Sequence, residues 1–130
     1  MQNTNGKTAL GLDNNVGALI CYLGNLVCAL GLIYSIIVLV TDKTNKLPRF
    51  HAFQSILLSA VSVIVAMVFG MIFGAAAASR SGILSGVGGL LYAVFALALL
   101  GAIIFCCIKA YQGQIFKLPI IGDLADKWSN

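Results

Sequence analysis

The chain has no glutamate, a single histidine, a single tryptophan and two prolines, and only 9% of its 130 residues are charged. Soluble domains carry about 25% charged residues, so this composition excludes an ordinary water-facing surface. All four acids lie outside the apolar runs: Asp13, Asp42, Asp123 and Asp126. Proton relays, ion paths and voltage sensors use ionisable residues within the membrane, and their absence from the runs argues against those functions.

Hydrophobic residues make up 60% of the chain and fall in three uncharged runs, 16–40, 52–78 and 81–108. About 20 apolar residues suffice for a helix to cross a bilayer. The third run opens with Gly82, Gly86, Gly88 and Gly89, which favour a loop and leave a span of about 90–108. A signal peptide is the alternative for the first run, but no small-residue cleavage site follows it. The sequence therefore predicts an all-α membrane protein with three transmembrane helices.

The two ends of the chain lack the long apolar runs of its centre. Residues 1–12 are polar without periodicity and are expected to be disordered, ahead of a three-span domain over 13–112. Residues 113–130 are expected to form a cytoplasmic interfacial tail, with Gly113 ending the third helix and Pro119 starting a short amphipathic one. The apolar face of that helix comprises Ile120, Ile121, Leu124 and Trp128. Lys46-Leu47-Pro48 and Lys117-Leu118-Pro119 form a short internal echo.

The basic residues predict an orientation. With three spans, Lys7 and Arg80 lie on one side of the membrane and the other six Lys and Arg on the opposite side. Short loops rich in Lys and Arg remain in the cytoplasm. We therefore expect a prokaryotic cytoplasmic (inner) membrane protein with its N-terminus outside and its C-terminus in the cytoplasm.

Small residues recur every three or four positions in the first two runs, which places them on one stripe of each helix. The stripes are Gly17, Cys21, Gly24, Cys28, Gly31 and Ser35 in the first run, and His51, Ser55, Ser59, Ser62, Ala66, Gly70 and Gly74 in the second. Helices in lipid associate through close backbone approach and polar contacts, so the two stripes are predicted to face each other. The alternative is that Gly is simply common in membrane helices.

No constellation of catalytic residues stands out. His51 has no carboxylate or cysteine at metal-ligand spacing, so neither a metal site nor a cofactor is expected. It is expected to bond headgroups or backbone, with proton handling as the alternative. Cys106 and Cys107 are expected to be small apolar filler, with acylation as the alternative. Phosphate-cradling and dinucleotide motifs are absent, and neither an enzyme nor a nucleic-acid partner is expected.

Three segments, 11–23, 49–58 and 109–125, resemble a family of small bacterial and archaeal membrane proteins of unknown function. That family is grouped with the twenty-kilodalton subunit of the chloroplast inner-envelope protein import translocon, which is usually drawn with four spans. The resemblance implies a helical membrane protein with a cytoplasmic-side structural or interaction cluster. Its members here are Arg49, His51, Gln54, Ser55, Tyr111, Gln112, Gly113, Pro119, Gly122 and Asp123.

The start of the second helix and the end of the third lie on the same predicted side of the membrane. Arg49, His51 and Gln54 are therefore expected to bond Tyr111, Gln112 or Asp123, and an Arg49–Asp123 pair is a specific hypothesis. The expected function is a non-enzymatic packing or accessory subunit, whose partners are the lipid bilayer and other membrane proteins or itself. The alternatives are a translocation component, which rests on the resemblance alone, and a small-solute channel or transporter dependent on Asn25 or Gln54.

Overall fold

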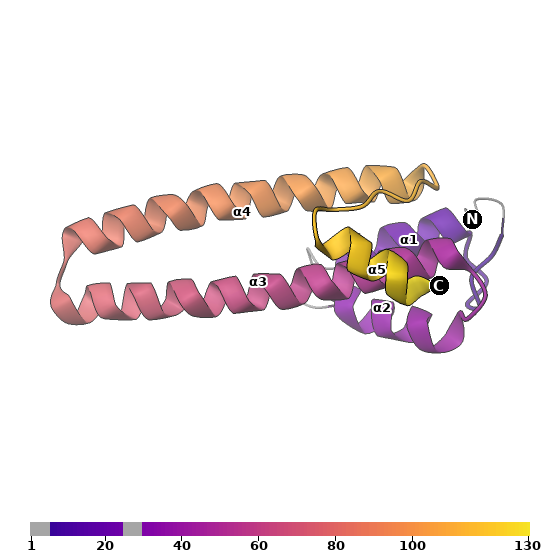
Figure 1. Cartoon of the computed structure of the whole chain (residues 1–130), viewed down its shortest axis with the longest axis horizontal. Helices are drawn as coiled ribbons and strands as arrows, with labels where there is room; N and C mark the ends of the chain where they lie inside the picture. Colours follow the sequence, from indigo (N-terminus) through magenta and orange to yellow (C-terminus); the bar gives the residue numbers. More distant parts are fainter. Residues whose placement is uncertain (1–5, 25–29) are drawn as a thin grey trace. The chain divides into compact units, whose positions relative to one another are not determined.

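The computed structural model describes residues 6–24 and 30–130, and this part of the chain is helical (Figure 1). Its helices are α1 (Asn14–Leu23), α2 (Leu30–Thr41), α3 (Lys46–Ser79), α4 (Gly82–Tyr111) and α5 (Ile121–Ser129). The described residues contain no strand beyond an isolated bridge between Lys7 and Asp13. The predicted all-α class is confirmed.

Two helices, α3 and α4, are long and apolar enough to cross a membrane. They hold 34 and 30 residues. At about 1.5 Å per residue they extend roughly 51 and 45 Å, more than a hydrocarbon layer of about 30 Å. Only 6% and 17% of their most apolar windows are buried, so these helices do not form the core of a soluble domain. Their surroundings must be apolar for such a surface to be stable.

Helix α4 begins at Gly82, so the prediction that Gly82, Gly86, Gly88 and Gly89 form a loop is wrong. The connection from α3 is short. Arg80, at φ 52°, ends α3, and the Ser81 hydroxyl accepts a hydrogen bond of 3.2 Å from the Leu84 amide at the start of α4. In apolar surroundings every backbone N–H and C=O needs a partner within the protein, which favours helix even through glycines.

The single helix predicted over 16–40 is also wrong, because α1 and α2 replace it and pack against each other. A Cβ added to Gly17 would lie 3.3 Å from the Tyr34 hydroxyl, and one added to Gly24 would lie 2.5 Å from Gly31 Cα. At 10 and 12 residues, the helices extend about 15 and 18 Å. Neither crosses a bilayer alone, so a third transmembrane helix is not confirmed.

The chain divides into two compact units. The first combines the described residues up to Ser59 with Ile103–Asn130, and so contains α1, α2, α5, the start of α3 and the end of α4. Its largest fully buried side chains are Tyr22, Phe50, Leu47, His51 and Gln54. This core therefore mixes apolar packing with polar groups.

Residues 6–12, predicted to be disordered, make specific hydrogen bonds within the first unit. Asn45 Nδ2 donates to the Lys7 carbonyl at 2.9 Å, and the Ala9 amide donates to Asp42 Oδ2 at 3.3 Å. Asn15 Nδ2 donates to the Tyr111 carbonyl at 3.0 Å, at the end of α4. These contacts join residues 6–12 to the α2–α3 turn, and the start of α1 to the end of α4.

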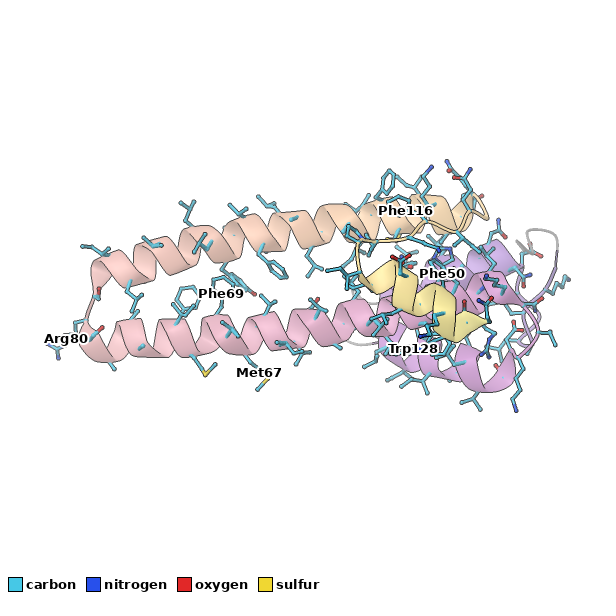
Figure 2. The ribbon with its side chains drawn as sticks, viewed as in Figure 1. Phe50, Met67, Phe69, Arg80, Phe116 and Trp128 are labelled. Atoms are coloured by element: carbon cyan, nitrogen blue, oxygen red, sulfur yellow. The ribbon has the colours of Figure 1, made fainter. Side chains whose placement is uncertain are left out.

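The second unit, residues 60–102, is a hairpin formed by the rest of α3 and α4. Phe69, Phe73 and Tyr92 form an aromatic cluster with ring centroids 5.3 to 6.4 Å apart. In Figure 2, Phe69 points toward α4, whereas Met67 points away from it. A cavity of about 280 Å³ lies between the two helices and is lined by Ser62, Val63, Ala66, Tyr92, Phe95, Ala96 and Leu99.

Candidate functional site

Three fully buried polar side chains meet inside the first unit: Tyr22 from α1, and His51 and Gln54 from α3. Positions 51 and 54 are three apart and therefore share a face of α3. The Tyr22 hydroxyl lies 2.9 Å from His51 Nδ1 and accepts a hydrogen bond from Gln54 Nε2, also at 2.9 Å. We call these three residues the anchor cluster.

The anchor cluster holds the backbone of the segment 114–118, which connects α4 to α5. His51 Nε2 lies 3.0 Å from the Gln114 carbonyl. Gln54 Nε2 donates to the Phe116 carbonyl at 3.1 Å, and Gln54 Oε1 accepts from the Leu118 amide at 3.3 Å. The carboxamide of Gln54 thus pairs with both a backbone carbonyl and a backbone amide two residues apart. A neighbouring β-strand would offer the same pair of hydrogen bonds.

The direction of each bond in the cluster follows from its partners. A backbone carbonyl can only accept, so in the neutral ring His51 Nε2 carries the proton and donates to Gln114. The other nitrogen, Nδ1, then accepts from the Tyr22 hydroxyl. The cluster satisfies the buried tail backbone without introducing a charge, which is the less costly arrangement in an apolar interior.

Ion pairs at the edge of the first unit dock α5. Asp126 lies 2.9 Å from Lys46 Nζ and 2.7 Å from Lys117 Nζ, and Lys117 also lies 3.6 Å from Asp123. Lys117, with Lys46, lowers the pKa of Asp126 to about 2, and Asp126 in turn raises the pKa of Lys117. Both lysines of the Lys-Leu-Pro echo therefore bind the same carboxylate.

Apolar contacts complete the docking of α5. The ring of Trp128 meets Phe53 edge to face at 6.1 Å, and Ala125 is fully buried. Figure 2 shows Trp128 on this short helix. A Cβ on Gly122 would lie 2.5 Å from Lys117 Cα, so only glycine fits there without movement. A short helix follows Pro119, whereas its amphipathic character and its position at the membrane interface stay a prediction.

Arg49 does not pair with Asp123, so that hypothesis is wrong. Its guanidinium donates to the Leu39 and Asp42 carbonyls at 3.3 and 3.2 Å, and it lies 5.8 Å from the ring centroid of Phe53. The free carbonyls at the end of α2 attract a cation, which accounts for this position.

The remaining family-motif residues lie around the 114–118 segment without joining the anchor cluster. Tyr111 and Gln112 are exposed, and Tyr111 contributes its carbonyl to Asn15. Gly113 is buried at φ 71° and ends α4, and Pro119 precedes α5. The expected side-chain partners of His51 and Gln54 are thus replaced by the backbone of the following residues.

The two small-residue stripes meet where Ser55 of α3 lies beside Cys21 of α1. The Ser55 hydroxyl donates to the Cys21 carbonyl at 2.7 Å, and Ser59 bonds back to Ser55. In the first stripe, Gly17, Cys21, Gly31 and Ser35 are buried, with Gly24 held against Gly31, whereas Cys28 lies outside the described residues. In the second, Ser62 and Ala66 line the cavity, and a Cβ at Gly70 or Gly74 would meet nothing within 4 Å.

Two residues that the analysis of the sequence did not single out fix the start of α3. Asp42 is 3% exposed, and its Oδ1 accepts from both the Asn45 side chain and the Asn45 amide. Asp and Asn are favoured in turns and at helix N-termini, which is the signal that could have identified them just ahead of the apolar run. Across 6–24 and 30–130, no group of three or more His, Cys, Asp or Glu side chains is placed to hold a metal ion.

The chain is similar to archaeal proteins described as UPF0132 membrane proteins. One from Methanocaldococcus jannaschii is 37% identical over 95% of this chain and 96% of its own length. A second from that organism is 32% identical over 92% of this chain and 73% of its own length. One from Archaeoglobus fulgidus is 31% identical over 75% of this chain and 88% of its own length. No solved structure matches.

These relatives and the two long apolar helices are consistent with a membrane location. The expected relation to the plastid import subunit is not supported, because these comparisons match archaeal membrane proteins. A family model described as the magnetosome magnetite crystal formation protein family matches residues 13–125. That match covers most of the sequence, including the anchor cluster and the 114–118 segment, and the chain therefore belongs to this family.

Proposed function

We propose that this protein is a non-enzymatic, multi-pass membrane protein that acts as an accessory subunit and packs against another membrane protein or a second copy. The observation that carries the proposal is an open face on α3 in the second unit. A Cβ added to Gly70 or Gly74 would meet nothing within 4 Å. A Gly-x-x-x-Gly pair lets a neighbouring helix approach closely in lipid, where packing drives association.

The residues around Gly70 and Gly74 support the same use. Met67 lies three positions before Gly70 on the same face and is 65% exposed, and Val63, one turn earlier, is 58% exposed and also borders the cavity. Met71 is 68% exposed and adjoins them. Flexible methionines beside a glycine groove adapt to a partner surface. The face thus offers a groove with apolar walls.

In the proposed topology, α3 and α4 cross the membrane, and the charged loops and the tail of the first unit lie on the cytoplasmic side. Seven of the eight Lys and Arg belong to that unit, whereas Arg80 alone lies in the opposite connection. Cytoplasmic loops carry such an excess of basic residues. Both chain termini then lie on the cytoplasmic side.

The alternatives receive less support from particular residues. A solute path through Gln54 would require a free amide, but both ends of this side chain are hydrogen-bonded, to Tyr22 and to the backbone of the 114–118 segment. The family description concerns magnetite crystal formation, and an iron-mineral surface is recognised by oxygen ligands. Asp42 and Asp126 are engaged by hydrogen bonds or lysines, and in the described part of the chain no group of three or more His, Cys, Asp or Glu side chains is placed to hold a metal ion. The proposal therefore does not include mineral binding.

Cysteine crosslinking in native membranes tests the packing surface. In a variant with the native cysteines replaced by alanine, Met67→Cys should crosslink to a partner or to itself. Leu97→Cys on α4, which is 70% exposed, serves as the matched control. Gly70→Leu added to Met67→Cys should abolish the product, because the leucine fills the groove. Equal crosslinking at both positions, unaffected by Gly70→Leu, would refute the proposed surface.

Topology is tested separately by a membrane-impermeant maleimide. We expect Ser81→Cys to react in intact spheroplasts and Thr44→Cys to react only in inside-out vesicles. Reaction of both cysteines from the same side would show that α3 does not cross the membrane.

A further inference from the structure

We infer that α1 and α2 form a re-entrant hairpin, which enters the hydrocarbon from the cytoplasmic side and returns to that side without crossing. Lipid acyl chains of the cytoplasmic leaflet cover its outer face. This inference rests on the proposed membrane placement of α3 and α4, and it assigns an interaction surface to a part of the chain that the proposed function leaves unassigned.

The first support is that both outer ends of the hairpin are tied to the same set of loops. Lys7, ahead of α1, accepts a hydrogen bond from Asn45, which follows α2. Asn15, in the first turn of α1, donates to the Tyr111 carbonyl at the end of α4. The contacts of Gly17 with Tyr34 and of Gly24 with Gly31 show that α1 and α2 run antiparallel. The chain therefore enters and leaves at one level.

The second support is the distribution of apolar side chains on α2, whose large apolar residues face outward. Its buried face contains the small or polar Gly31 and Ser35 and a single larger apolar residue, Val38. Its outer face is a stripe of large apolar side chains, 40 to 65% exposed, made of Leu30, Ile33, Ile36, Ile37 and Val40. The helix has no charged residue. A soluble helix has the opposite arrangement, with its apolar stripe facing the core. This outer face requires a hydrocarbon solvent.

The third support is depth. The Ser55 hydroxyl bonds the Cys21 carbonyl, which fixes α1 beside the third turn of α3. Ser55 lies nine residues after Lys46, or about 14 Å along the helix, which is roughly half of a 30 Å hydrocarbon layer. At the other end of α2, Arg49 binds the Leu39 and Asp42 carbonyls, as expected where a helix end meets the headgroups. The hairpin thus fits within one leaflet.

Spin labelling of the full chain tests this inference. Single-cysteine variants Ile33→Cys, Val40→Cys and Thr44→Cys would be labelled in vesicles of phosphatidylcholine and phosphatidylglycerol. Collision rates with oxygen and with a water-soluble nickel chelate are then compared. We expect the oxygen-to-nickel ratio to fall at least several-fold from Ile33 to Thr44, with Val40 between them. These positions are outside the anchor cluster, so the fold should be retained, which circular dichroism can verify.

Three results would overturn the inference. A nickel rate above the oxygen rate at Ile33 would place the hairpin in water. Low rates with both reagents would show that protein covers this face. Reaction of Leu10→Cys with an impermeant maleimide from the side opposite to Thr44→Cys would show that the α1–α2 region crosses the membrane. The topology proposed for α3 depends instead on the comparison of Ser81→Cys with Thr44→Cys, so its failure is distinguishable from these results.

Discussion

Replacing Gln54 by leucine should release the segment between α4 and α5. Leucine has a similar volume but no polar atoms, so the Phe116 carbonyl and the Leu118 amide lose their partner within an apolar unit. Leaving a buried polar group unsatisfied costs about 1–3 kcal/mol. Because these two bonds are part-buried, the lower end of that range applies to each group, which gives about 2 kcal/mol for the pair. Domains have a total stability of about 5–15 kcal/mol, so the loss is large for the first unit.

Hydrogen exchange measured by mass spectrometry gives the most direct assay, because the Leu118 amide is itself one of the affected groups. A tenfold change in an equilibrium corresponds to about 1.4 kcal/mol, so a loss of about 2 kcal/mol predicts exchange faster by about 30-fold. The effect should be confined to a peptide covering 114–118 if the tail is released locally. Faster exchange in α1 as well would indicate that the whole first unit opens.

The matched control is Gln112→Leu, which makes the same chemical change at an exposed position of the same connection. It should leave exchange of the 114–118 peptide within about threefold of wild type, since surface substitutions change stability by about 0.5 kcal/mol or less. If Gln54→Leu behaves like this control, the anchor cluster does not hold the tail, and the reasoning from its hydrogen bonds fails.

Other substitutions test the remaining contacts. Gly24→Ala should lower the melting temperature in detergent, because the added methyl meets the backbone of the facing helix, whereas Gly70→Ala should leave it unchanged; equal shifts would contradict the α1–α2 packing. Asp126 has a folded pKa of about 2, below its unfolded value of about 3.9, so its contribution is present above about pH 4 and is lost toward pH 2. The single tryptophan, Trp128, should report that loss by fluorescence, and Asp126→Asn should remove the transition; an unchanged profile would refute the ion-pair account. Gly122→Ala should also shift Trp128 emission, by displacing α5 from Lys117, and unaltered emission would count against that close contact.

The two long helices could be predicted from the sequence because charged residues mark both ends of each apolar run. Arg49 and Arg80 bracket the apolar part of α3, and Arg80 and Lys109 bracket that of α4. Water near those charges fixes the ends, whereas glycines between them do not break the helix, since the apolar environment offers the backbone no other partner. Counting glycines as loop therefore placed the start of α4 too late.

The first run could not be resolved in this way, because no charge falls within 16–40. A stripe of small residues has two physical solutions. It can receive a separate helix, or the chain can reverse so that the stripe packs against itself, and the pattern at positions 17, 21, 24, 31 and 35 is compatible with both. Periodicity shows which face of a helix carries the small residues, but it does not show which other helix packs against that face. Total apolar length cannot separate one span from two half-length helices.

For the candidate site, the sequence indicated that His51 and Gln54 would meet the end of the chain, and the structure brings them to the segment that follows α4. The predicted partners were side chains, chosen because charges and hydroxyls are visible in a sequence. Backbone groups left unpaired by an extended segment are not visible there. Tyr22 was likewise hard to assign, because an isolated tyrosine in an apolar helix shows no partner until the fold places one beside it.

The anchor cluster is neutral and fully buried, whereas the ion pairs of α5 are charged and partly exposed. This difference follows from the free-energy cost of burying charge. An ionised group desolvated in an apolar interior carries a penalty of several kcal/mol unless it is well paired, whereas a neutral amide or imidazole needs only hydrogen bonds. The fully buried positions accordingly hold Tyr22, His51 and Gln54. The Lys46–Asp126 pair retains about a quarter of its side-chain exposure and lies at the rim. The tail is therefore fixed deep in the unit by neutral groups and aligned at its surface by charged ones, which makes it an integral part of the fold.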